Sequence, residues 1–301
     1  MYFEIRHTTR YTYSGPVSLE PTLVRLRPRS DCTQRLLDFS LTVGPPPAGR
    51  CEGIGLEGNT AITLWFTGHV NRLTLESRAV VETLRTNPFD FLVADPGLLS
   101  LPVQYPDPVA QSLAPHLRRT GESHASESLA SRVASEAGGD TVHFLVALTE
   151  HIASSLRKER RPEGMPLSPA QTLARGKGAC RDLAVLFMDC CRSQGLAARF
   201  VSGYEEIGVD EPRSELHAWA EVFLTGAGWR GFDPNEGLAV ADRHVALAAA
   251  SDPAGATPIE GTFRGDGVTS ALETDLTVKR VDGPEDRDEP NRAGGLERRE
   301  S

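Results

Sequence analysis

A cysteine set between a glycine pair and an apolar helical pattern is the feature that most constrains the fold of this chain. Gly176 and Gly178 loosen the backbone directly before Cys180. Behind the cysteine, apolar side chains recur at the spacing of one helix face, at Leu183, Leu186, Phe187 and Cys190. We therefore predict that Cys180 lies at a helix N-terminus, where unpaired N–H groups and the helix dipole favour an anion. A thiol there ionises more easily and can act as a nucleophile, whereas an inert buried cysteine is the alternative.

Two residues downstream are candidate partners for this thiol. His217 opens a strongly alternating strand pattern, and Asp233 ends the pattern that returns after a glycine-containing turn. A simple hairpin would place Glu236 rather than Asp233 nearest to His217, so we expect a bulge or a diagonal contact. In that arrangement Cys180 attacks a carbonyl, His217 transfers the proton, and Asp233 orients the imidazole and stabilises its charged form.

The negative charge that forms on the attacked carbonyl needs hydrogen-bond donors. The backbone N–H of Cys180 is the first candidate, and Gln171 and Trp219 are candidates for a second donor. Trp219 shares the strand face of His217 by the two-residue period, so we also predict that it lines the substrate cleft, with core packing as the alternative. Asp182, in the first helical turn, is expected to compensate the helix dipole rather than to take part in catalysis.

The chain divides by pattern into four parts, and the predicted fold class is α+β. Residues 1–95 alternate between apolar and polar in short runs separated by turns, which predicts an antiparallel β-sandwich-like domain, with a small barrel as the alternative. Residues 96–165 are rich in proline at first and then helical in period, which predicts a helical connector. Residues 166–281 are expected to form the catalytic core, a nucleophile helix packed on an antiparallel sheet. Residues 282–301 have the composition of a disordered tail.

Within the core, the local signals predict the order of the elements. Ser168 and Pro169 begin a short helix, and the helix of Cys180 continues to about Gln194. The strands that carry His217 and Asp233 follow. After Pro234 we expect another helix, then a glycine-containing loop and a last strand over 272–281.

Composition and charge argue against several classes of partner. The formal net charge of −9 disfavours a nucleic-acid backbone or an anionic membrane as the main partner. The sequence contains no run of 18 apolar residues, so no transmembrane helix is predicted. The five cysteines are odd in number and contain no C-x-x-C pair, so neither a disulfide framework nor a closed zinc site is expected. The polar start is unlike a signal peptide, and we expect a cytoplasmic protein with reduced thiols. The oligomeric state stays open.

Three segments resemble the core of the transglutaminase-like superfamily, which is similar in fold to papain-type cysteine proteases. They are G-x-G-A-C-R-D at 176–182, H-A-W-A-E-V at 217–222 and G-W-x-G-F-D-P at 228–234. The segment I-R-H-T-T-R-Y-x-Y at 5–13 resembles the β domain that precedes this core in bacterial members, and the resemblance extends to about residue 281.

By this resemblance Cys180 is the nucleophile, His217 the base and Asp233 its partner. One departure is that the oxyanion glutamine of papain-type enzymes has no match, because Ala174 and Arg175 stand in its place. The superfamily includes proteases, amidases and cross-linking enzymes, as well as binding modules without activity.

The function predicted from the sequence is a thiol-dependent acyl transfer on amide bonds of a peptide or protein substrate. No calcium loop is present, so hydrolysis is favoured over amine cross-linking, and no cofactor is expected. A non-catalytic peptide-binding module on the same fold is the main alternative. A metal hydrolase with Cys180, His217 and Asp233 as ligands is a third hypothesis, disfavoured because no closely spaced ligand pair occurs in the sequence.

Overall fold

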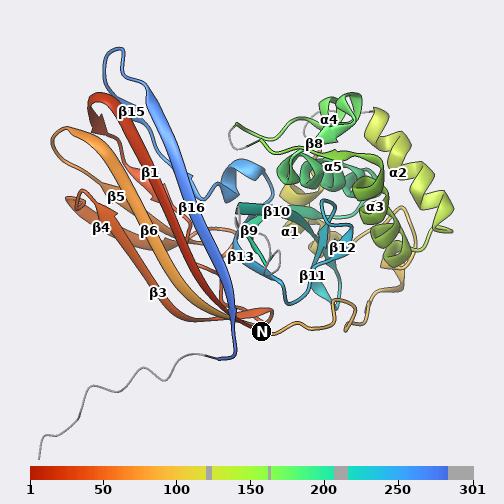
Figure 1. Cartoon of the computed structure of the whole chain (residues 1–301). Helices are drawn as coiled ribbons and strands as arrows, with labels where there is room; N and C mark the ends of the chain where they lie inside the picture. The colour runs from red at the N-terminus through yellow and green to blue at the C-terminus, as the bar shows by residue number, and fades with distance from the viewer. Residues whose placement is uncertain (120–123, 162–163, 207–215, 284–301) are drawn as a thin grey trace, which may run out of the picture.

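The computed structural model describes residues 1–119, 124–161, 164–206 and 216–283. Figure 1 shows a strand-rich part, a central sheet beside it and a layer of helices on the far side of that sheet. The architecture is α+β with mostly antiparallel sheets, as the sequence predicts. No helix in these described ranges has both the length and the apolar character needed to cross a bilayer.

The strand-rich part is a two-sheet sandwich. One sheet has the order β15-β1-β6-β3, with β16 also paired to β1, and the other has the order β14-β2-β5-β4. Alternating apolar side chains from both sheets form one buried cluster, which includes Phe3, Ile62, Leu64 and Val81. The bounds are β1 (Tyr2–Leu19), β2 (Thr22–Val24), β3 (Gln34–Gly44), β4 (Gly49–Ile54), β5 (Thr60–Trp65), β6 (Val70–Thr83), β14 (Ile259–Glu260), β15 (Phe263–Arg264) and β16 (Ser270–Val281).

The second part has an antiparallel sheet of order β12-β11-β10-β9-β13, covered by helices. Helices α2, α3 and α5 and the sheet share one apolar cluster, in which Phe144, Leu186 and Phe232 are buried. The sheet consists of β9 (Ala198–Glu205), β10 (Leu216–Leu224), β11 (Gly228–Asp233), β12 (Leu238–Ala239) and β13 (His244–Ala250). The other elements are η1 (Pro96–Leu98), α1 (Asp107–Leu117), α2 (His124–Glu136), α3 (Thr141–Ser155), β7 (Arg157–Lys158), α4 (Pro169–Arg175), β8 (Lys177–Gly178), α5 (Cys180–Ser193) and η2 (Pro253–Ala256).

The boundaries predicted for the domains differ from the structure in two places. β16 pairs with β1 along its whole length, from Tyr2↔Val281 to Tyr13↔Ser270, so the last strand of the predicted core, 166–281, belongs to the sandwich. The stretch 96–165 is not a separate connector, because its helices bury their apolar faces in the same cluster as α5. The tail predicted to be disordered lies outside the described residues from 284 onward.

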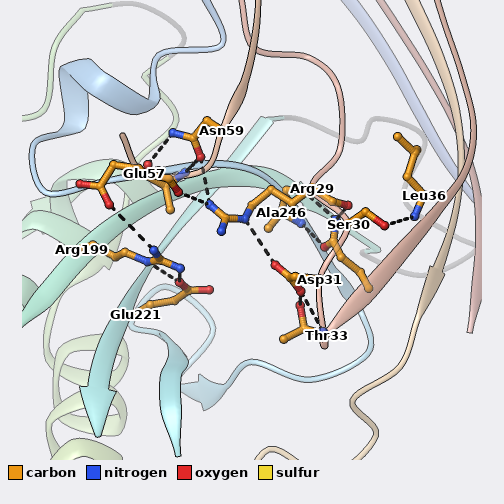
Figure 2. Close-up of polar contacts among 12 residues, drawn as sticks. Arg29, Ser30, Asp31, Thr33, Leu36, Glu57, Asn59, Arg199, Glu221 and Ala246 are labelled. Atoms are coloured by element: carbon orange, nitrogen blue, oxygen red, sulfur yellow. Dashed lines mark hydrogen bonds and ion pairs between the residues drawn. The ribbon is translucent and has the colours of Figure 1, made fainter. Parts of the chain in front are cut away.

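The prediction of a helix after Pro234 is wrong, because His244–Ala250 forms the edge strand β13. On the edge of β13 that faces the sandwich, side-chain amides form the hydrogen bonds that another strand would otherwise provide. Gln34 exchanges two hydrogen bonds with the backbone of Ala246, at 3.0 and 2.7 Å, and Asn59 does the same with Ala249, at 2.6 and 2.9 Å. Figure 2 shows Asn59 together with Ala246 in this contact region. The sandwich therefore satisfies an edge that would otherwise be open.

Candidate active site

Cys180 is the first residue of α5, as the sequence predicts. α4 ends at Arg175 and is capped by Gly176, whose φ of 61° is the left-handed conformation that glycine adopts without strain. Gly178 is required by packing, because a Cβ at this position would lie 2.9 Å from the Cβ of Asp182. Cys180 itself is partly exposed, so its thiol is open to a substrate at the dipole-positive end of the helix.

Asp182 fixes the start of this helix. Its carboxylate is fully buried and accepts the backbone N–H of Ala179 at 2.9 Å and that of Leu167 at 2.8 Å. It also forms an ion pair with Arg161. The expected dipole compensation is thus combined with a buried hydrogen-bonding role that holds the residues before the cysteine in place.

His217 and Asp233 meet through a diagonal contact between two neighbouring strands. The register of β10 and β11 runs from Leu224↔Gly228 to Ala220↔Phe232, and its continuation leaves Asp233 diagonal to His217 on the same face. The Nε2 of His217 lies 2.6 Å from the Oδ2 of Asp233, and both side chains are buried. No bulge is needed between the two strands.

The Cys180 side chain interacts with the imidazole of His217 and contributes to the raised pKa of that histidine. Because the Nε2 of His217 faces Asp233, Nδ1 is the ring nitrogen left for the thiol. Burial alone lowers the pKa of His217, but the charge and hydrogen bond of Asp233, together with the contact to Cys180, hold that pKa well above its ordinary value. The imidazole is therefore set to carry a proton beside the sulfur.

The environment of Asp233 favours the ionised carboxylate. Burial raises its pKa, but the charge and hydrogen bond of His217 and the hydrogen bond of His244 hold it well below the usual range. The Oδ1 of Asp233 accepts the backbone N–H of Asn235 at 2.9 Å and that of Glu236 at 3.2 Å. These contacts stabilise a charged His217–Asp233 pair.

Sequence reasoning missed two polar residues that complete this cluster. The Nε2 of His244 lies 3.0 Å from Oδ2 of Asp233, and Oε2 of Glu205 lies 3.5 Å from Nε2 of His217. Alternation along β9 places Glu205 on the face of Gly203, but the pairing of Gly203 with His217 is visible only in the folded chain. The sequence gives no signal for His244, because the segment after Pro234 is predicted to be a helix and not a strand of this sheet.

Glu205, His217, Asp233 and His244 offer donor atoms that all lie within 4.8 Å of one another, which is the donor set of a transition-metal site. This set differs from the predicted one, since Cys180 is not among its members. A ligating histidine normally donates its other ring N–H to an acceptor. The buried Nδ1 of His244 has no such partner in the described part of the chain, so these residues fit a hydrogen-bonded cluster better than a metal site.

The two predicted second oxyanion donors are not held in that role. Trp219 is 1% exposed and packs beside the rings of His217, at 6.2 Å between centroids, and His244, at 5.1 Å. It lies beneath the cluster, so its predicted place on the substrate cleft does not fit its burial. The side-chain oxygen of Gln171 accepts the N–H of Ser168 in the capping box of α4. The backbone N–H of Cys180 stays the candidate donor.

Comparisons with known proteins match both parts of the chain. Residues 3–82 match the model of the bacterial transglutaminase-like N-terminal region, and residues 127–234 match that of the transglutaminase-like superfamily. An uncharacterized protein of Mycobacterium tuberculosis is 24% identical over 302 residues, covering 93% of each chain. One from Mycobacterium leprae is 26% identical over 281 residues, covering 91% of this chain and 97% of the relative.

A solved structure has the same fold over nearly the whole chain. It is the crystal structure of a protein from Cytophaga hutchinsonii described as a candidate cysteine protease, with a TM-score of 0.67. The two chains are 21% identical, and the match covers 94% of this chain and 92% of the other. At this identity the likeness concerns the fold alone.

Proposed function

Because the chain belongs to the transglutaminase-like superfamily, we propose that it is a thiol-dependent acyl-transfer enzyme that hydrolyses amide bonds in peptides or proteins. The observation that carries the proposal is the buried His217–Asp233 pair, with 2.6 Å between Nε2 and Oδ2, whose histidine also has its pKa raised by Cys180 at the start of α5. A binding module has no need of a nucleophile, a base and a buried carboxylate in one line.

In the first half of the reaction, His217 takes the thiol proton and the Cys180 sulfur attacks the carbonyl carbon of the substrate amide. A C–S bond forms, and the carbonyl oxygen becomes an oxyanion within reach of the Cys180 backbone N–H. His217 then gives the proton to the leaving nitrogen as the C–N bond breaks. The products are a free amine and a thioester on Cys180.

In the second half, water replaces the amine. His217 removes a proton from the water as its oxygen attacks the thioester carbonyl, and the C–S bond breaks to release a carboxylic acid and the thiol. Asp233 stays ionised throughout and stabilises the imidazolium. Hydrolysis is proposed over amine transfer because no calcium-binding loop occurs in the sequence. A cytoplasmic location stays a prediction from the sequence.

The test is cleavage of an unbiased peptide library by the full-length protein in ¹⁸O-labelled water, read by mass spectrometry. We expect new carboxyl termini carrying the label, with no products from Cys180→Ala. Cys51→Ala is the matched control, because that cysteine is exposed on β4, in the sandwich, and should retain full activity. Added methylamine should leave most products as acids. Cleavage that survives in Cys180→Ala would contradict the thiol mechanism, and predominant methylamide products would contradict hydrolysis.

A further inference from the structure

A second histidine shares the carboxylate of Asp233. The Nε2 of His244 lies 3.0 Å from Oδ2, the same oxygen that His217 contacts at 2.6 Å. Together with the two backbone N–H groups on Oδ1, these contacts give the carboxylate four hydrogen-bond partners. A carboxylate has about four acceptor sites, so its orientation is fully specified by the surrounding protein.

The ring nitrogens of His244 indicate which one carries the proton. Nε2 faces an ionised oxygen, whereas Nδ1 is buried and has no partner among the described residues. A neutral imidazole with its N–H at Nε2 satisfies this arrangement, because the bare Nδ1 then needs no acceptor. His244 is 5% exposed, and Trp219 packs against its ring edge-on. The histidine is therefore placed as a donor to Asp233.

The strand that carries His244 is held on both sides of it. Thr83 of the sandwich donates its hydroxyl to the backbone oxygen of Asp242 at 2.8 Å, and Gln34 is bonded to both backbone groups of Ala246. Glu205 pairs directly with His244 in the sheet register. These contacts leave the imidazole little freedom to turn away from Asp233.

We propose that His244 is a positioning residue of the active site, whose imidazole N–H holds the Asp233 carboxylate in the orientation that aligns His217 with Cys180. The proposal rests on the proposed function, since it assigns a role within that reaction. In this role His244 acts on the reaction through Asp233.

The charged and titratable groups around His244 come from each strand packed against it. Asp233 lies on β11, His217 on β10 and Glu205 on β9, where Oε1 of Glu205 is 3.9 Å from Nε2 of His244 and 4.0 Å from the guanidinium of Arg243. Burial raises the pKa of Glu205, against the attraction of the two histidines. The Nε2 of His244 lies 3.0 Å from Asp233 but 3.9 Å from Glu205, so Asp233 is its hydrogen-bond acceptor.

The test compares His244→Leu, which removes the donor, with His244→Gln, whose side-chain amide restores an N–H. The readout is the rate at which iodoacetamide alkylates Cys180 between pH 5 and pH 9, read by mass spectrometry. We expect His244→Leu to slow alkylation below pH 7 by about tenfold, the scale of one hydrogen bond to a charged group, and His244→Gln to recover most of the rate. His116→Leu is the matched control, because His116 is also buried and bonded to a carboxylate, Glu57, outside the site. It should leave the profile unchanged.

Failure of this proposal differs from failure of the proposed function. If wild-type Cys180 reacts rapidly below pH 7 and His244→Leu keeps that profile, His244 has no positioning role. If wild-type Cys180 shows no such reactivity, the proposed function fails and the role of His244 fails with it. Should His244→Leu not fold, NMR of ¹⁵N-histidine-labelled wild-type protein decides: a neutral Nε2–H tautomer is expected. A proton on Nδ1, or stoichiometric zinc bound by both histidines, would overturn the proposal.

Discussion

At the scale of single residues, the site depends on a buried charge pair, His217 and Asp233. Each partner shifts the pKa of the other, and the two shifts have opposite directions. The pKa of His217 is raised and that of Asp233 is lowered. A raised histidine pKa stabilises the fold fully below the unfolded value of about 6.5, and this contribution is lost as pH rises through the folded value. A lowered aspartate pKa stabilises the fold above about pH 4, and this contribution is lost as pH falls through the folded value.

We therefore predict that Asp233→Asn lowers the free energy of unfolding most strongly between about pH 4 and pH 6.5. The loss there should be roughly 3–5 kcal/mol, because the substitution leaves the imidazolium of His217 buried without its counter-charge. Urea unfolding of both proteins across the pH range measures the difference. A difference that is constant with pH would mean that the two groups do not form a charged pair.

Local sequence was sufficient to predict some of these residues and insufficient for others. Cys180 stands at a helix start with clear periodicity, and His217 stands on a strand with a clear two-residue alternation, so both are visible in short windows of sequence. Glu205 and His244 come from the ends of two further strands, and only the pairing of β9 with β10 and β13 brings them to the same place. Such pairing is a property of the folded chain.

At the scale of elements, β13 shows why the prediction of a helix failed. The segment His244–Ala250 is rich in alanine, the residue with the highest helix propensity, yet it is a fully buried strand. Its backbone is fixed by β9 on one edge and by the amides of Gln34 and Asn59 on the other. Tertiary hydrogen bonds thus override an intrinsic preference of less than about 1 kcal/mol per residue.

The amide contacts of Asn59 make a prediction for this strand. Asn59→Ala leaves the N–H and C=O of Ala249 without their partners, so the free energy of unfolding should fall by about 1–3 kcal/mol. Hydrogen exchange at Ala249 should accelerate, as measured by mass spectrometry of peptides that cover β13. Asn71→Ala is the matched control, because Asn71 is exposed on β6. Equal exchange in the two variants would show that the sandwich does not anchor β13.

At the scale of the whole molecule, the chain leaves the sandwich, builds the helix-covered sheet and returns to the sandwich. Its last long strand, β16, completes the sheet that β1 begins (Figure 1). Local pattern predicts that 272–281 is a strand but carries no information on a partner more than 250 residues away, so the predicted domain boundary differs from the structure.

A polar network also joins the two parts of the molecule. Glu57 of the sandwich contacts both His116 and Arg199, and Arg199 is paired with Glu221 at 2.6 Å (Figure 2). Arg199 also lies over the ring of Trp229, at 4.2 Å from its centroid. With the amide contacts on β13, these interactions connect the sandwich to the same sheet that carries His217, Asp233 and His244. The sandwich and this sheet are therefore held together by side-chain contacts.

The central claim is that Cys180 and His217 form a reactive thiolate–imidazolium pair. Its most direct test is the pH dependence of alkylation by iodoacetamide in the wild type and in His217→Ala, with every labelled cysteine identified by mass spectrometry. Cys32 and Cys51 are exposed and serve as internal references, while burial raises the pKa of the Cys190 and Cys191 thiols and should keep them unlabelled. We predict rapid labelling of Cys180 below pH 7 that is lost in His217→Ala. Labelling of Cys180 only above about pH 8, unchanged in the variant, would contradict the account and favour a binding module on an enzyme's fold.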